Sequence, residues 1–134
     1  MQKASGYRGY VAARPVLGNR VPQHVQNLVI RDFARRLGLD YKLSGTEYTM
    51  PGCYMMLEEI LNELPQLDGI VAYTLFMLPR ATERRRAVYG RVIDAGKTLY
   101  GAVEGLRLST WDDAARIEDI WRVQLALDHM SSRA

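Results

Sequence analysis

The chain has 134 residues, of which 48% are hydrophobic and 25% charged, a composition typical of one globular domain with its own core. Its longest apolar stretches, such as Ile70–Ala72 and Leu75–Leu78, are far shorter than the roughly 20 residues of a membrane helix, so no membrane partner is expected. No apolar signal segment is visible, and the single cysteine, Cys53, cannot form an internal disulfide. We therefore expect a cytoplasmic protein with a single domain over residues 1–134 and an ordered core over 6–129.

The formal net charge is +3, and the charges are unevenly spread. Arginines cluster at Arg80 and Arg84–Arg86, and acids cluster further on, at Asp112, Asp113, Glu118 and Asp119. A basic cluster of this kind is either a solvated helix face or a surface for phosphate or nucleic acid. Because no aromatic stacking pattern accompanies the arginines, nucleic acid is not the expected partner.

Strand and helix patterns alternate along the chain. β-Branched and aromatic runs predict four strands, over Gly6–Ala13, Leu39–Leu43, Asp68–Leu75 and Lys97–Glu104. Helical periodicity and capping residues predict four helices, over Gln23–Leu37, from near Cys53 to Leu64, over Thr82–Ala95, and from Thr110 onward. Short connections between such units require parallel strands joined by right-handed crossovers. The predicted fold is an α/β three-layer sandwich with a four-stranded, mostly parallel sheet in the order 2-1-3-4.

The first predicted helix has the clearest boundaries. Pro22 is suited to a helix start, and Gly38 to the left-handed residue that follows a helix end. An apolar stripe is expected to face the sheet, formed by Val25, Leu28, Val29, Phe33 and Leu37.

The position of a binding site follows from this topology. In open α/β sheets, ligands bind beyond the carboxyl ends of the strands, where the strand order changes direction, here between the first and third strands. The loops that meet there are residues 14–22, 44–52, 75–81 and 104–109. The segment from Arg14 to Asn27 is the most polar of this region.

Five side chains of that segment suit an anionic substrate. Arg14 and Arg20 can clamp a phosphate or carboxylate, and Gln23 and His24 fall in the first helical turn, where free N–H groups favour an anion. The helix dipole opposes protonation of His24 and leaves it able to act as a base. Asn27 lies one turn further along the same edge. Helix capping and ordering of the loop are the alternative roles for these groups.

Further candidates lie in the other loops. Glu47 is a candidate general acid or base and Tyr48 a proton donor, with a solvated loop glutamate as the alternative. Cys53, near a helix start, is a candidate nucleophile, with a buried and inert thiol as the alternative. The predicted substrate-binding set is completed by Arg8, Tyr73 and Glu104.

No metal or cofactor is expected. One histidine and one cysteine at this edge do not form a recognised set of metal ligands. The glycines after the first strand match neither of the common phosphate-binding loop patterns.

Several segments resemble the catalytic domain of serine resolvases and invertases. Tyr10–Arg14 resembles their first strand, Gln23–Leu37 their first helix, and Leu67–Tyr73 their third strand. Lys97–Ser109 resembles their strand that ends before the Glu-Gly…Ser-Thr segment. The resemblance implies a resolvase-like, flavodoxin-like fold. It does not imply strand transfer, because Arg14-Pro15-Val16 stands where the nucleophilic serine is expected, and Phe76–Arg80 lacks the aspartate and first arginine of the family motif. The DNA-binding domain that resolvases append is also not found in this sequence.

A second resemblance covers Gly6–Glu104. Gly6–Tyr10, Arg20–Arg31, Thr46–Tyr54 and Asp68–Pro79 are similar to a family named for sporadic carbohydrate clusters, small proteins associated with bacterial sugar and surface-glycan biosynthesis genes. This resemblance implies a biological setting and no particular reaction.

Two hypotheses follow from these features. The favoured one is a metal-independent isomerase, epimerase or lyase of carbohydrate or nucleotide-sugar biosynthesis, in which Arg14 and Arg20 hold a sugar-derived substrate and His24 and Glu47 transfer protons. The alternative is a non-catalytic module of the resolvase fold that binds a protein or nucleic acid through Arg80–Arg86. Because the chain has no segment to serve as a lid domain, a homo-oligomer is expected to complete the pocket.

Overall fold

The computed structural model describes residues 6–131 and contains a five-stranded sheet in the order β2-β1-β3-β4-β5. The strands are β1 (Tyr7–Ala12), β2 (Tyr41–Glu47), β3 (Gly69–Ala72), β4 (Thr98–Gly101) and β5 (Leu106–Leu108). The first four are parallel, and β5 pairs antiparallel with β4 at the edge. The predicted four-stranded sheet is therefore corrected to five strands. The run predicted as one strand, Lys97–Glu104, contains β4 and part of the turn that follows it. Strand β5 comes after this turn.

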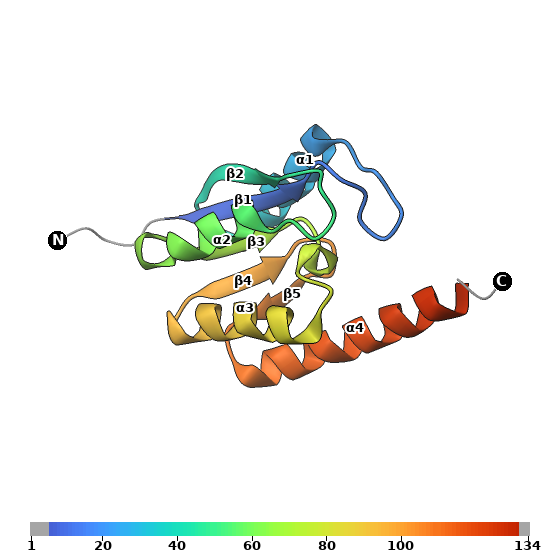
Figure 1. The fold of residues 1–134 in the computed structure, drawn as a ribbon. Coiled ribbons are helices and arrows are strands. Elements are labelled where there is room, and N and C mark those ends of the chain that lie inside the picture. Colours follow the sequence, from blue (N-terminus) through green and yellow to red (C-terminus); the bar gives the residue numbers. More distant parts are fainter. Residues whose placement is uncertain (1–5, 132–134) are drawn as a thin grey trace.

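Helices cover both faces of this sheet, as Figure 1 shows. They are α1 (Gln23–Leu37), α2 (Met55–Asn62), α3 (Thr82–Asp94) and α4 (Trp111–Ser131), with two short 3-10 helices, η1 (Leu64–Gln66) and η2 (Leu75–Met77). On one face, Ile30 and Phe33 of α1 form a small core with Val11 and Val71 of the sheet. The larger core lies on the other face, where side chains of α2, α3 and α4 pack together. This arrangement is the expected α/β sandwich. None of the helices within residues 6–131 is long and apolar enough to span a membrane.

Helix α1 has the predicted boundaries but buries a different face. Gly38 adopts the left-handed conformation after the last turn, with φ of 71°. Leu28 and Leu37 of the predicted stripe are exposed, and the buried residues are instead Gln26, Ile30, Phe33 and Ala34. Buried glutamine is tolerated here because the end of β1 supplies backbone partners for its amide.

Strand β2 lies several residues later than predicted. The segment assigned to a loop from Ser44 onward pairs with β1, with Tyr10 opposite Gly45 and Ala12 opposite Glu47. Gly45 is buried where α2 crosses the strand, and a β-carbon there would lie only 2.7 Å from the side chain of Met56. This glycine permits a close helix–strand approach and does not mark a turn.

Strand β3 is shorter than predicted and is completely buried. It ends at Ala72, because Thr74 starts the turn into η2, where its Oγ1 accepts a hydrogen bond from the N–H of Phe76 at 3.3 Å. Helix α3 begins at Thr82, as predicted, with Ala81 as its N-cap residue.

A buried ion pair joins α3 to α4. Arg85 is 2% exposed, and its Nε and Nη2 donate to the two carboxylate oxygens of Glu118 at 2.7 and 2.8 Å. The hydroxyl of Tyr89 donates to the same carboxylate at 2.6 Å, and the guanidinium lies 4.2 Å from the ring centroid of Trp121. Burial acts to raise the pKa of Glu118, but the hydrogen bonds from Arg85 and Tyr89 outweigh it, so this pKa lies below its usual value. Arg85 is thus internal, whereas its neighbours Arg84 and Arg86 are exposed.

Replacing Glu118 tests the importance of this pair. In Glu118→Gln, the Arg85 charge stays buried without its counter-charge, so the free energy of unfolding should fall by about 3–5 kcal/mol in chemical denaturation. The matched control is Asp119→Asn, which removes an exposed partner of Arg122 and should cost less than about 1 kcal/mol. Equal stability of the two variants would contradict the prediction.

The lowered pKa of Glu118 also predicts how stability depends on pH. A carboxyl with a depressed pKa in the folded state stabilises the protein fully above its unfolded-state pKa, about 4.3, and loses this contribution as pH falls through the lower folded-state value. Denaturation measured from neutral to acidic pH should show a stability loss in the wild type that is smaller in Glu118→Gln. Identical slopes would show that Glu118 does not contribute.

Candidate functional site

Two cavities open at the carboxyl edge of the sheet, where the loops after β1, β2 and β3 meet. The larger cavity has a volume of about 700 Å³ and the second cavity about 520 Å³. Arg14, Val16 and Leu17 of the loop after β1 line both cavities, together with Phe76 of η2. The structure therefore has its main hollows at the edge that the sequence indicated.

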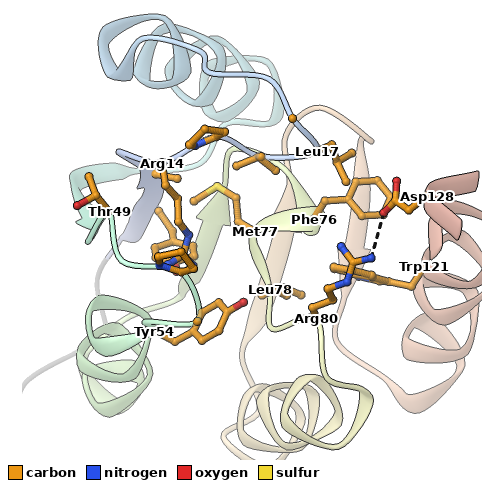
Figure 2. Close-up of a pocket in the computed structure, with 17 residues that line it drawn as sticks. Arg14, Leu17, Thr49, Tyr54, Phe76, Met77, Leu78, Arg80, Trp121 and Asp128 are labelled. Carbon is orange, nitrogen blue, oxygen red and sulfur yellow. Dashed lines mark ion pairs between the residues drawn. The ribbon is translucent and has the colours of Figure 1, made fainter. Parts of the chain in front are cut away.

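The larger cavity combines positive charge with apolar and aromatic surface. Figure 2 shows Arg14 and Arg80 on different sides of it, with Met77 and Leu78 between them. Of its lining residues, Asp128 alone is acidic, and its Oδ2 lies 3.4 Å from Nη2 of Arg80. Four partly or fully buried aromatic residues also line the cavity: Tyr10, Tyr54, Phe76 and Trp121.

Arg14 ties the loop after β2 to the end of β1. Its Nη1 donates to the carbonyl oxygens of Met50 and Cys53 at 2.7 and 2.8 Å. Its guanidinium carbon lies 4.9 Å from the ring centroid of Tyr54, and the guanidinium carbon of Arg84 lies at the same distance from that ring. Neither arginine forms an ion pair within the described part of the chain. Two guanidinium charges therefore concentrate around one tyrosine at the cavity.

Glu47 occupies a different environment from the one predicted. It is the last residue of β2 and is fully buried, not a loop residue open to solvent. Its carboxylate accepts hydrogen bonds from the N–H groups of Met56 and Leu57 at 3.0 and 3.1 Å and from the Tyr10 hydroxyl at 2.7 Å. Burial and this neighbouring carboxylate raise the pKa of Tyr10 far above its usual value. Glu47 thus provides the hydrogen-bond acceptors for N–H groups that are left free at the start of α2.

Four of the predicted substrate-binding residues line the second cavity: Arg14, Arg20, Tyr73 and Glu104. The Glu104 carboxylate accepts from the Thr74 hydroxyl at 2.5 Å and from the N–H of Leu75 at 2.8 Å. It therefore orders the turn after β3 as well as facing the cavity.

Three residues of α1 lie outside both cavities. His24 is exposed, and Gln23 accepts a hydrogen bond from Thr46 at 3.2 Å. The side-chain oxygen of Asn27 accepts from Ser44 at 2.6 Å. Gln23 and Asn27 thus link α1 to β2.

The remaining candidates are also dispersed. Tyr48 is 49% exposed and Cys53 is partly buried, and neither lines one of the two cavities. Arg8 lies near the start of β1, where it pairs with Glu63 at 2.7 Å. The structure therefore does not bring together the four predicted catalytic groups, His24, Glu47, Tyr48 and Cys53.

Sequence reasoning missed Gln26, which closes the end of β1. Its amide accepts from the N–H of Ala12 and donates to the Ala12 carbonyl, both at 2.9 Å, and also donates to the carbonyl of Val21 at 2.8 Å. Its helical spacing to Ile30 and Phe33 was the available signal. Trp121 also lines the larger cavity, and its buried Nε1 has no hydrogen-bond partner within residues 6–131.

Comparisons with known proteins identify the fold. The chain is similar to the N-terminal catalytic domain of TP901-1 integrase, with a TM-score of 0.56 and 14% identity over 94% of this chain and 97% of that one. It is also similar to a resolvase family site-specific recombinase from Streptococcus pneumoniae, with a TM-score of 0.61 and 12% identity over 94% and 95% of the two chains. No family model and no curated protein matches the sequence. The protein thus has the fold of resolvase and integrase catalytic domains.

These comparisons correct the favoured functional hypothesis. The structural neighbours are an integrase domain and a site-specific recombinase, so the expected sugar isomerase, epimerase or lyase is not supported, nor is a sugar-derived substrate. The expectation that excluded nucleic acid as a partner is corrected for the same reason. The resemblance to the sporadic carbohydrate cluster family is not shown by any of the comparisons.

The contacts of Glu47 predict a structural effect of its replacement. Glu47→Gln places an amide donor against N–H or O–H donors, so the free energy of unfolding should fall by about 1–3 kcal/mol. Because Cys53 lies in the loop that leads into α2, its thiol should also react faster with a labelling reagent. The control is Glu58→Gln on the exposed side of α2, where loss of a surface ion pair with Arg91 should cost less than about 1 kcal/mol. A Glu47→Gln protein with unchanged stability and labelling would refute this role.

Proposed function

We propose that the protein is a non-catalytic nucleic-acid-binding module built on the resolvase fold. The proposal takes its class of partner from the structural neighbours, an integrase domain and a recombinase. It depends above all on two exposed arginines of α3, Arg84 and Arg86.

The proposal is based mainly on the exposure of two arginines, Arg84 and Arg86. Both are exposed in the first turns of α3, which begins at the carboxyl edge of the sheet, and neither has an ion-pair partner within residues 6–131. Each guanidinium lies near an aromatic ring, Arg84 at 4.9 Å from Tyr54 and Arg86 at 5.4 Å from Trp111. Arginines held in this way and open to solvent are suited to contacts with a phosphate backbone.

The residues at the end of β1 support binding without strand cleavage. Arg14-Pro15-Val16 stands where the resemblance to serine resolvases places the nucleophile. Two serines with described side chains make hydrogen bonds away from this position. Ser44 donates to Asn27, and Ser109 donates to Asp113. The larger cavity is lined by the hydroxyls of Thr49, Tyr10 and Tyr54, and that of Tyr10 is buried against Glu47.

Nucleic acid is favoured over a protein partner by the charge at this edge. Arg14 and Arg80 line the larger cavity, and its one acidic lining residue is Asp128. Arg84 reaches the ring of Tyr54, which also lines this cavity, and Arg86 lies beside Trp111. A phosphate backbone supplies regularly spaced negative charges that match such a surface.

Duplex DNA binding tests the proposal. The wild type should bind a fluorescently labelled duplex with an affinity that falls steeply as salt increases, because phosphate contacts release counterions. Arg84→Gln combined with Arg86→Gln should weaken binding and reduce the slope of log affinity against log salt by about 2. Fluorescence anisotropy over a salt series measures both quantities.

The matched control is Arg35→Gln combined with Arg36→Gln. It removes the same charge from the last turn of α1, where both arginines pair with Asp32. Affinity should change little in this control. No DNA binding by the wild type at low salt, or equal losses in the two double variants, would overturn the proposed function.

A further inference from the structure

We propose that the larger cavity binds one unpaired nucleotide, whose base enters among the apolar and aromatic side chains and whose phosphate meets Arg14 and Arg80. The inference rests on the proposed function and adds the kind of nucleic-acid feature that the site recognises. Four properties of the cavity support it.

The cavity has a suitable size and position. Its volume of about 700 Å³ lies within the range of about 300–1,000 Å³ that is common for small-molecule pockets. It is next to the exposed Arg84, which shares the Tyr54 ring with Arg14. A strand whose backbone contacts Arg84 would therefore pass close to Tyr54, which lines the cavity.

The two guanidiniums keep donors for an anion. Arg14 uses Nη1 for its bonds to the loop after β2, and its Nε and Nη2 have no hydrogen-bond partner within residues 6–131. Arg80 has a side chain that is 66% exposed, and Asp128, at 3.4 Å, is its only ion-pair partner among the residues that the structure describes. Arginine donors in this arrangement match the oxygen geometry of a phosphate.

The walls suit a flat, partly apolar group. Met77 and Leu78 are buried and lie between the two arginines in Figure 2, and Phe76 adds a partly exposed ring. Phe76 is held by an edge-to-face contact with Trp121, with a centroid separation of 5.0 Å. Nucleobases stack on protein rings with little dependence on sequence, because each base has an aromatic face.

Trp121 adds a buried donor to the wall of the cavity. This residue lines the cavity and is only 3% exposed, and its Nε1 is without a protein partner within residues 6–131. Buried donors are nearly always satisfied in folded proteins. Because Nε1 itself is enclosed, an acceptor of a base reaches it only if neighbouring side chains move when the nucleotide enters.

The test compares duplexes that differ in one base. One duplex carries a single extrahelical thymine, the second carries an abasic nucleotide at the same bulge, and the third is fully paired, so the first two have the same backbone charge. The protein should bind the thymine bulge about tenfold more tightly than the abasic bulge. In a Trp111→Phe background, where Trp121 is the sole tryptophan, the thymine bulge should also change the Trp121 emission.

Variants of Thr49 locate the effect in the cavity. Thr49 is exposed and lines the cavity mouth, so Thr49→Trp should block entry and bring the thymine and abasic bulges to equal affinity. Thr49→Ala is the matched small variant and should keep the preference. Arg80→Gln should weaken the binding of both bulged duplexes, because both keep the phosphate, and Arg80→Lys should restore part of that affinity; circular dichroism confirms that each variant is folded.

The outcomes separate the two proposals. Equal affinity for the thymine and abasic bulges, with binding that still depends on Arg84 and Arg86, overturns the nucleotide pocket and leaves the proposed function intact. If no DNA binds, the proposed function fails, and titration with free thymidine monophosphate decides on the pocket. A Trp121 response to the mononucleotide that inorganic phosphate does not produce would then assign the pocket to a free nucleotide, and no response to either would overturn it.

Discussion

The carboxyl edge of the sheet depends on side chains that satisfy the backbone of loops from other parts of the chain. Loops at such an edge contain N–H and C=O groups that helices and strands leave free, and buried groups of this kind must be hydrogen-bonded. Gln26 bonds the end of β1, Glu47 the start of α2, and Glu104 the turn after β3. Arg14 instead acts as a donor, to carbonyl oxygens of the loop after β2. Each of these four side chains thus fixes the backbone of a segment at the edge where the two cavities open.

The same requirement explains why chemical candidates read from the sequence have structural roles here. Glutamate, glutamine and asparagine can satisfy backbone or side-chain donors as readily as they can act on a substrate, and sequence position does not distinguish the two uses. Glu47 and Asn27 illustrate this, because both are engaged within the protein. Arginines differ in this respect, since they carry more donors than one loop can use. Arg14 therefore orders a loop and still presents charge at the cavity.

The arginine cluster of α3 divides into two roles that the sequence cannot separate. Arg84, Arg85 and Arg86 are consecutive, but a helix turns successive side chains through about 100°, so only one of them, Arg85, is buried against α4. Arg85 lies against Glu118 and Trp121 and sets the packing of α4 behind the larger cavity. Its neighbours remain at the surface, where charge is available to a partner. The wall of the proposed nucleotide pocket is thus connected, through Trp121, to the ion pair that joins the two helices.

The sequence by itself determined the alternation of strands and helices, the limits of α1, and the edge at which loops converge, because periodicity, proline and glycine act locally. It also indicated that Arg14-Pro15-Val16 replaces the nucleophile of the fold that the chain resembles. Only the tertiary structure decided that β2 runs through Gly45 to Glu47, because helix packing against the strand makes that glycine a contact point. The fifth strand depended in the same way on pairing with β4. Burial of Arg85 and exposure of Arg84 and Arg86 were likewise set by the position of α4, which is distant in sequence and adjacent in space.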